Sequence, residues 1–175
     1  MAEPGRVLVA CVGNVLRGDD GFGPAVERRL AADGSLPPGV DLIETGIGGM
    51  GIVQQLLAGY QVLIVVDAVD HGEAPGTLFV LEPEVPEPGA LSLDEWRERF
   101  SNLHLAEPSR VFLLARALGV LPERVLVVGC QPLACDDFTQ TLSPPVAAAV
   151  GLAARRVREL ATESAGVGAP ARIGP

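Results

Sequence analysis

Short runs of apolar, mostly β-branched residues punctuate the chain and predict the strands of one sheet. The runs Val7–Val12, Val62–Asp67 and Val125–Gly129 are continuous rather than alternating, which is typical of strands buried on both faces. Two further runs, Val40–Glu44 and Thr77–Leu81, complete the set. Glycine, proline and polar residues bound these runs, so we expect five strands separated by loops and helices.

Between the strands, apolar residues recur at helical spacing. Pro24 is typical of a first helical turn, and so are Pro108 and the pair Ser143–Pro144 later in the chain. A short helix is also expected before the third strand. The expected apolar faces are Ile52, Val53, Leu56 and Leu57 in this short helix, Val111, Leu114, Ala115 and Leu118 in the helix after Pro108, and Val146, Val150, Ala153, Val157 and Leu160 in the last helix.

Strands that alternate with helices predict an α/β fold, with helices on both faces of a mostly parallel sheet. The turn His71–Gly76 is too short for a helical crossover, so the strand Thr77–Leu81 is expected to run antiparallel. With 175 residues we expect a single domain over residues 1–161, followed by a flexible tail over residues 162–175. Ligands of such folds bind beyond the carboxyl ends of the strands, which directs attention to those loops.

Charge and composition exclude several classes of protein. The formal net charge is −9, which disfavours a nucleic-acid binder that neutralises phosphates. No apolar run approaches the roughly 18 residues of a membrane span, and the first run is too short for a signal peptide. The three cysteines, Cys11, Cys130 and Cys135, form no pairing framework, which favours a reducing compartment. We therefore expect a soluble, cytoplasmic protein.

The glycine-rich loop Gly13–Gly23 follows a strand and precedes a helix, as a phosphate-binding loop does. However, Asp19 and Asp20 lie at the entrance to the helix, where they would repel a pyrophosphate, so no nucleotide cofactor is expected. These two residues could instead bind a cation, or simply cap the helix. Asp67 ends an apolar strand at the edge where α/β active sites form, although a turn-capping role would also explain it.

Either of the two histidines, His71 or His104, could complete a set of two carboxylates and one imidazole. Such a mixed set leaves coordination positions open and suits nickel, zinc, iron or manganese better than magnesium. Spacing alone does not choose between the histidines. Conventional nucleophiles are weakly represented, because the chain has no G-x-S-x-G elbow and Cys11 lies within an apolar strand.

Five motifs, in the order GNVLRGDDGFG, VVDAV, HGEAPGT, SNLHL and VVGCQP, resemble those of the hydrogenase maturation endopeptidases. The resemblance runs over roughly Val7–Leu160. It implies a three-layer α/β/α sandwich on a five-stranded mixed sheet with one antiparallel strand. It also implies removal of the C-terminal extension from the precursor of a [NiFe]-hydrogenase large subunit, after nickel insertion. Carried over by motif, the metal-contacting residues of the family fall on Asp20, Asp67 and His104, so the resemblance selects His104 over His71.

The resemblance thus predicts an aspartic-type protease whose nickel is supplied by its partner, the large-subunit precursor. Asp19 is a candidate catalytic proton acceptor, and Gly48 and Gly49 would let the second loop approach an extended substrate peptide closely. Two alternatives remain open at this point. One is a non-catalytic nickel-binding maturation chaperone, and the other is a nucleotide-binding regulatory domain built on the first loop.

Overall fold

The computed structural model describes residues 5–46, 49–90, 92, 94–95, 108–135 and 138–166. Within them lies the expected five-stranded sheet, with its strands in the order β2-β1-β3-β5-β4. The strands are β1 (Val7–Cys11), β2 (Val40–Glu44), β3 (Val62–Ala68), β4 (Leu78–Leu81) and β5 (Arg124–Cys130). The helices are η1 (Gly18–Gly21) and η2 (Pro88–Ala90), both of 3-10 type, with α1 (Phe22–Ala32), α2 (Met50–Leu56), α4 (Pro108–Ala117) and α5 (Pro144–Gly166).

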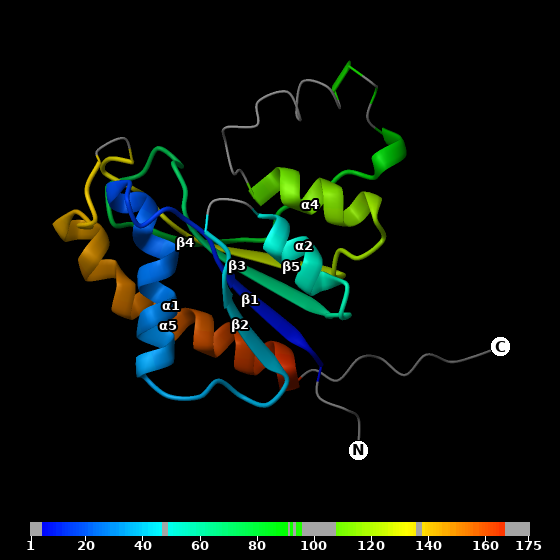
Figure 1. The fold of residues 1–175 in the computed structure, drawn as a ribbon, viewed down its shortest axis with the longest axis horizontal. Coiled ribbons are helices and arrows are strands. Elements are labelled where there is room, and N and C mark those ends of the chain that lie inside the picture. The colour runs from blue at the N-terminus through cyan, green and yellow to red at the C-terminus, as the bar shows by residue number, and fades with distance from the viewer. Residues whose placement is uncertain are drawn as a thin grey trace.

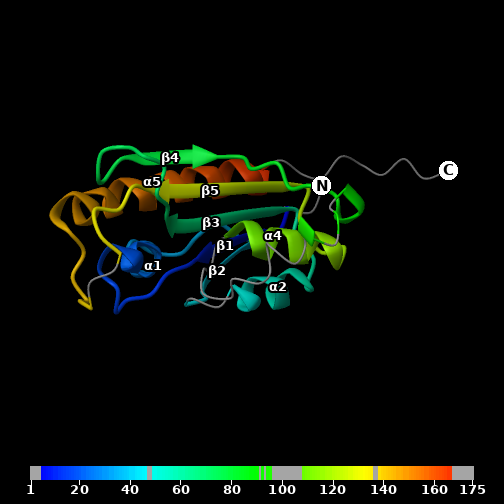
Figure 2. The same ribbon diagram turned by 90° about the horizontal axis from the view of Figure 1, so that it is seen from above.

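The sheet is mixed, as the sequence predicts. Strands β2, β1, β3 and β5 run parallel, whereas β4 pairs antiparallel with β5, Leu78 lying opposite Cys130. Helices α1 and α5 cover one face of the sheet, and α2 and α4 cover the other (Figures 1 and 2). The three-layer α/β/α sandwich is therefore confirmed.

Alternate residues of β1 pack into two separate cores, which explains its continuous apolar run. Val7 and Val9 belong to the core shared with α1 and α5, while Leu8 and Ala10 belong to the core shared with α2 and α4. Successive side chains of a strand point to opposite faces, and both faces of this strand are covered by helices. All five residues of β1 are consequently buried.

Two residues of the predicted helix faces are exposed instead, both just past a helix end. Leu57 is 68% exposed because α2 ends at Leu56, and Leu118 is 57% exposed because α4 ends at Ala117. Gly119 follows with a φ of +70°, and its N–H bonds to the carbonyl of Arg116. Within α4 the predicted Ala115 is buried, but Phe112 and Leu113 are buried where the sequence predicts Val111 and Leu114, and these two are only partly buried.

The last helix runs further than the sequence predicts. It continues to Gly166, past the boundary at residue 161, and both Ser164 and Ala165 are buried against the rest of the molecule. Residues 167–175 of the expected tail lie outside the described part of the chain. In that described part, no helix combines the length and the apolar character needed to cross a membrane.

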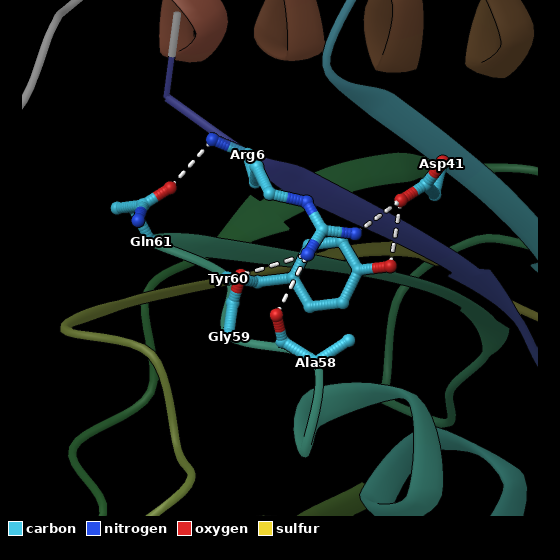
Figure 3. A network of polar contacts seen from close by, with 6 residues as sticks. All are labelled: Arg6, Asp41, Ala58, Gly59, Tyr60 and Gln61. Carbon is cyan, nitrogen blue, oxygen red and sulfur yellow. Dashed lines mark hydrogen bonds and ion pairs between the residues drawn. The ribbon is translucent and has the colours of Figure 1, made fainter. Parts of the chain in front are cut away.

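A polar network ties together the chain segments at the edge of the sheet where β1 begins (Figure 3). The guanidinium of Arg6 lies over the ring of Tyr60, 4.4 Å from its centroid. It donates to the carboxylate of Asp41 at 3.0 Å and to the carbonyl oxygen of Ala58 at 2.7 Å. The backbone N–H of Arg6 also donates to the side chain of Gln61. This network fixes the amino ends of β1, β2 and β3 relative to one another, at the edge away from the candidate site.

Candidate functional site

The candidate site lies where the chain changes its direction of winding across the sheet. From β1 the chain passes through α1 to β2 on one side, and then returns through α2 to β3 on the other side of β1. The loops that leave the carboxyl ends of β1 and β3 therefore diverge, and such a switch point forms a binding crevice in α/β folds. Asp20 lies in η1, which follows β1, and Asp67 lies near the end of β3.

Asp20 and Asp67 are brought together, as the sequence predicts. Asp67 is only 6% exposed, and its pKa is raised well above the usual value, first by burial and then by the charge of Asp20. The pKa of Asp20 is also raised by burial, although the backbone N–H of Asn14 donates to its Oδ2 at 3.1 Å and the charge of Arg17 acts in the opposite direction. The surroundings thus disfavour two negative charges, which is the condition that a bound cation relieves.

A third ligand for a metal ion is not found among the residues that the structure describes. No cluster of three or more His, Cys, Asp or Glu side chains there could hold a metal. His104 and Gly48, both predicted at the site, lie outside the described residues. His71 is described and exposed, with its ring 5.0 Å from that of Phe79. Two carboxylate donors, Asp20 and Asp67, are thus the described part of the site.

Asp19 is held by partners that leave it little capacity to accept a further proton. It is 1% exposed, and four hydrogen bonds reach its carboxylate. Oδ2 accepts from the N–H of Leu133 at 2.8 Å, from the N–H of Ala134 at 3.2 Å and from the hydroxyl of Ser143 at 2.8 Å, while Oδ1 accepts from the N–H of Ser143 at 2.7 Å. Together these bonds outweigh burial and lower the pKa of Asp19. This arrangement argues against the predicted role as proton acceptor and favours a structural one.

The helix-capping explanation for the two aspartates also finds no support in the described residues. There, the hydrogen bonds of Asp19 go to residues more than a hundred positions later, and that of Asp20 goes back to Asn14. Neither carboxylate accepts from the helix that it precedes, and the first residue before α1 is Gly21, which has no capping side chain. Ser143 likewise uses its hydroxyl to donate to Asp19.

Gly49 has a different explanation from the predicted one. Its φ is +47°, and a Cβ atom at this position would lie 2.3 Å from Cγ2 of Val111 in α4. Close packing of the second loop against α4 therefore requires glycine here, independently of any substrate peptide.

Two site-forming residues escape sequence reasoning. Gly13 has a φ of +143°, and a Cβ there would lie 1.9 Å from the carbonyl oxygen of Asp20, so only glycine lets the first loop fold back onto its own strand.

Gln131 is buried directly after β5, and its Oε1 accepts from the N–H groups of His71 at 2.7 Å and Glu73 at 3.1 Å. Its Nε2 donates to Asp70 at 3.0 Å. We call these contacts of Gln131 with His71, Glu73 and Asp70 the Gln131 clamp. Its only sequence signal is a polar residue directly after an apolar strand.

The thiols are poorly suited to act as nucleophiles. Cys11 and Cys130 are completely buried, and burial together with the charge of Asp19 raises the pKa of Cys130 to about 11. Burial also raises the pKa of Cys11. A thiolate is the reactive form, so both residues are inert at neutral pH.

Comparisons with known proteins agree on one family. The model of the hydrogenase maturation protease family matches residues 24–159. HupD, a hydrogenase expression/formation protein of Rhodobacter capsulatus, is 37% identical over 161 residues, which cover 90% of this chain and 72% of HupD. HoxM of Azotobacter vinelandii is 37% identical over 171 residues, with coverages of 97% and 78%. Among solved structures, the hydrogenase maturating endopeptidase HybD from E. coli is similar with a TM-score of 0.71 at 28% identity, covering 91% of this chain and 93% of HybD. The hydrogenase 2 maturation peptidase of a Thaumarchaeota archaeon is 36% identical with a TM-score of 0.63, covering 89% of this chain and 97% of that one.

Proposed function

Since the chain belongs to the hydrogenase maturation protease family, we propose that it cuts the C-terminal extension from a [NiFe]-hydrogenase large-subunit precursor after nickel insertion. The observation that supports this most directly is the pair Asp20 and Asp67 at the switch point. Burial raises the pKa of both carboxylates, and the charge of Asp20 raises the pKa of Asp67 further. A substrate that brings its own divalent cation is the partner that such a pair favours.

In this scheme Asp20 and Asp67 contact nickel that the precursor already holds, and His104 supplies the third ligand. Three ligands from the protease leave coordination positions for ligands from the precursor. Holding the substrate through its own metal places the scissile peptide bond beside the two aspartates, which lowers the entropic part of the barrier. The bond is then cleaved with the help of a nickel-polarised carbonyl or a nickel-activated water. On this proposal the enzyme would be an aspartic-type endopeptidase in which Asp20 and Asp67 bind the metal of the substrate.

We propose that the reaction takes place in the cytoplasm, where the precursor and its nickel would meet the protease. Cys11 and Cys130 are buried free thiols, which is consistent with a reducing compartment. The formal net charge of −9 is consistent with a protein partner rather than a nucleic acid.

A paired assay on one precursor tests the proposal. The purified protein is incubated with the nickel-loaded precursor and with the nickel-free precursor, and mass spectrometry follows the mass of the precursor C-terminus. We expect shortening of the nickel-loaded form only, because without the cation nothing offsets the repulsion between the buried Asp67 and the half-buried Asp20, and the substrate loses its main anchor. Equal cleavage of both forms would contradict the proposed recognition of nickel, but the assignment as a peptidase would still hold.

The same incubation separates the two alternatives. A non-catalytic nickel-binding chaperone would bind the loaded precursor without shortening it. A nucleotide-binding regulatory domain would bind ATP or NAD in a calorimetric titration, whereas the carboxylates of Asp19 and Asp20 beside the first loop predict no such binding.

A further inference from the structure

Asp19 is a buried charged residue for which the proposed reaction has no use. Its carboxylate accepts four hydrogen bonds from Leu133, Ala134 and Ser143, all in the segment between β5 and α5. Two carboxylate oxygens are needed to accept from all of these donors at once. The hydrogen bonds described for the two oxygens of Asp19 go to this segment and not to Asp20 or Asp67.

The backbone of the same turn reinforces this attachment. The N–H of Asp19 donates to the carbonyl of Ala134 at 3.1 Å, and the N–H of Gly18 donates to the carbonyl of Thr139 at 2.8 Å. Arg17 also forms an isolated parallel bridge with Thr139. Figures 1 and 2 both show the segment after β5 lying beside the η1 turn. The turn is thus anchored to the β5–α5 segment through both main chain and side chain.

Asp20 is the next residue of this short turn, so its position depends on the anchor. The turn has only four residues, Gly18–Gly21, and on its other side Gly13 lies against the carbonyl of Asp20. Because Asp67 is fixed by the sheet, the spacing between the two acids is set by where the η1 turn is held. A shift of the turn would move one acid of the pair while leaving the other in place.

We propose that Asp19 is a positioning residue, which holds Asp20 at the separation from Asp67 that grips the nickel of the substrate. This inference rests on the proposed function and deepens it. Asp19 touches neither the substrate nor the reacting atoms, and it acts through Asp20. Residues that orient metal ligands in this way typically change metal affinity or activity by tenfold to a hundredfold when they are replaced.

The substitution Asp19→Asn tests this because it keeps the shape of the side chain and removes one acceptor. An amide whose oxygen takes the place of Oδ2 still accepts from Leu133, Ala134 and the Ser143 hydroxyl, but its NH2 group then opposes the N–H of Ser143. The attachment is weakened at one end rather than destroyed. Asp41→Asn is the matched control, because Asp41 also accepts side-chain hydrogen bonds but lies at the opposite edge of the sheet.

Steady-state cleavage of the nickel-loaded precursor is measured for wild type, Asp19→Asn, Asp19→Ala and Asp41→Asn, below the melting temperature of each. For Asp19→Asn we expect KM to rise by about tenfold or more, with kcat within about threefold of wild type. Its preference for the loaded over the nickel-free precursor falls by the same factor. Asp19→Ala shows a larger effect where it folds, and Asp41→Asn keeps the wild-type KM and kcat.

Two results would overturn the inference. Loss of kcat in Asp19→Asn with an unchanged KM would make Asp19 a catalytic proton acceptor. Wild-type kinetics and wild-type nickel preference in Asp19→Asn would show that its carboxylate does not position the pair. Should Asp19→Ala fail to fold, Asp19→Asn still decides between these outcomes. Failure of the wild-type protein to cut either precursor would instead overturn the proposed function, so the two failures are distinguishable.

Discussion

The hydroxyl of Tyr60 donates a 2.6 Å hydrogen bond to Oδ2 of Asp41, the same oxygen that accepts from Arg6. The Tyr60 bond is the largest cause of the lowered pKa of Asp41, and the bond and charge of Arg6 add to it. Oδ2 of Asp41 in β2 is thus bonded both to Arg6, just before β1, and to Tyr60, in the loop before β3.

The first prediction concerns stability at that edge. Tyr60→Phe removes the hydroxyl and should lower the free energy of unfolding by about 1 kcal/mol, without affecting cleavage. Because the folded pKa of Asp41 is lowered, its contribution is present above the unfolded pKa and is lost as the pH falls through the folded pKa. Urea unfolding at neutral and acidic pH should therefore show a smaller acid-dependent loss in Tyr60→Phe than in wild type. An equal loss in both proteins would contradict this assignment.

The second prediction separates activity from stability at the acid pair. Asp67→Asn keeps the shape of a buried side chain but removes a charge that burial and Asp20 both disfavour. The variant should be at least as stable as wild type and should lose cleavage by a factor of about a hundred or more. Thermal melting and mass spectrometry of the precursor measure the two effects. A variant that melts earlier and still cuts would show that Asp67 serves the fold and not the site.

The third prediction assigns the histidines. His104→Ala should abolish cleavage of the nickel-loaded precursor, because the third metal ligand is lost. His71→Ala should be nearly silent in the same assay, since the His71 ring is exposed against Phe79 and only its backbone N–H bonds to Gln131. A folded His71→Ala variant without activity, assessed by circular dichroism, would transfer the ligand role to His71.

The fourth prediction is that the thiols are dispensable. A variant that carries both Cys130→Ala and Cys135→Ser should still process the precursor, because the Cys130 thiol is buried with a pKa raised to about 11. Some loss of stability is expected from the cavity left at Cys130. Complete loss of activity with an unchanged circular dichroism spectrum would revive a thiol mechanism.

The fifth prediction tests the Gln131 clamp. Gln131→Ala leaves the N–H groups of His71 and Glu73 without their acceptor and should destabilise the protein by about 1–2 kcal/mol. Hydrogen exchange at these two amides should speed up, while amides in the centre of β3 keep their protection. Unchanged exchange at His71 and Glu73 would mean that solvent already competes for these bonds.

The strands could be predicted because their burial leaves a direct mark on the sequence. Val9 and its neighbours in β1 are all apolar since helices cover both faces of the sheet. The antiparallel direction of β4 followed from the short turn before it, and the pairing of Leu78 with Cys130 confirms it. Helix ends were less predictable, because the apolar spacing that includes Leu57 and Leu118 continues past the residue where each helix stops.

Only the part of the candidate site that lies at the carboxyl ends of strands could be predicted from the sequence. Asp20 and Asp67 could be placed together because parallel strands deliver their carboxyl ends to one edge. The partners of Asp19 could not be foreseen, since two of its donors are the backbone N–H groups of Leu133 and Ala134, 114 and 115 positions later. Peptide N–H groups are common to nearly every residue type, so they leave no mark in a sequence.

The anchoring of the η1 turn has a consequence for the order in which the site is completed during biosynthesis. Both acids, together with the β1 and β3 strands that carry them, leave the ribosome before the segment that anchors Asp19 has been made. A nascent chain that ends before Leu133 therefore contains Asp20 and Asp67 but lacks all four donors that hold the carboxylate of Asp19. The geometry of the acid pair is thus completed only when the β5–α5 segment has been made and has packed against the η1 turn.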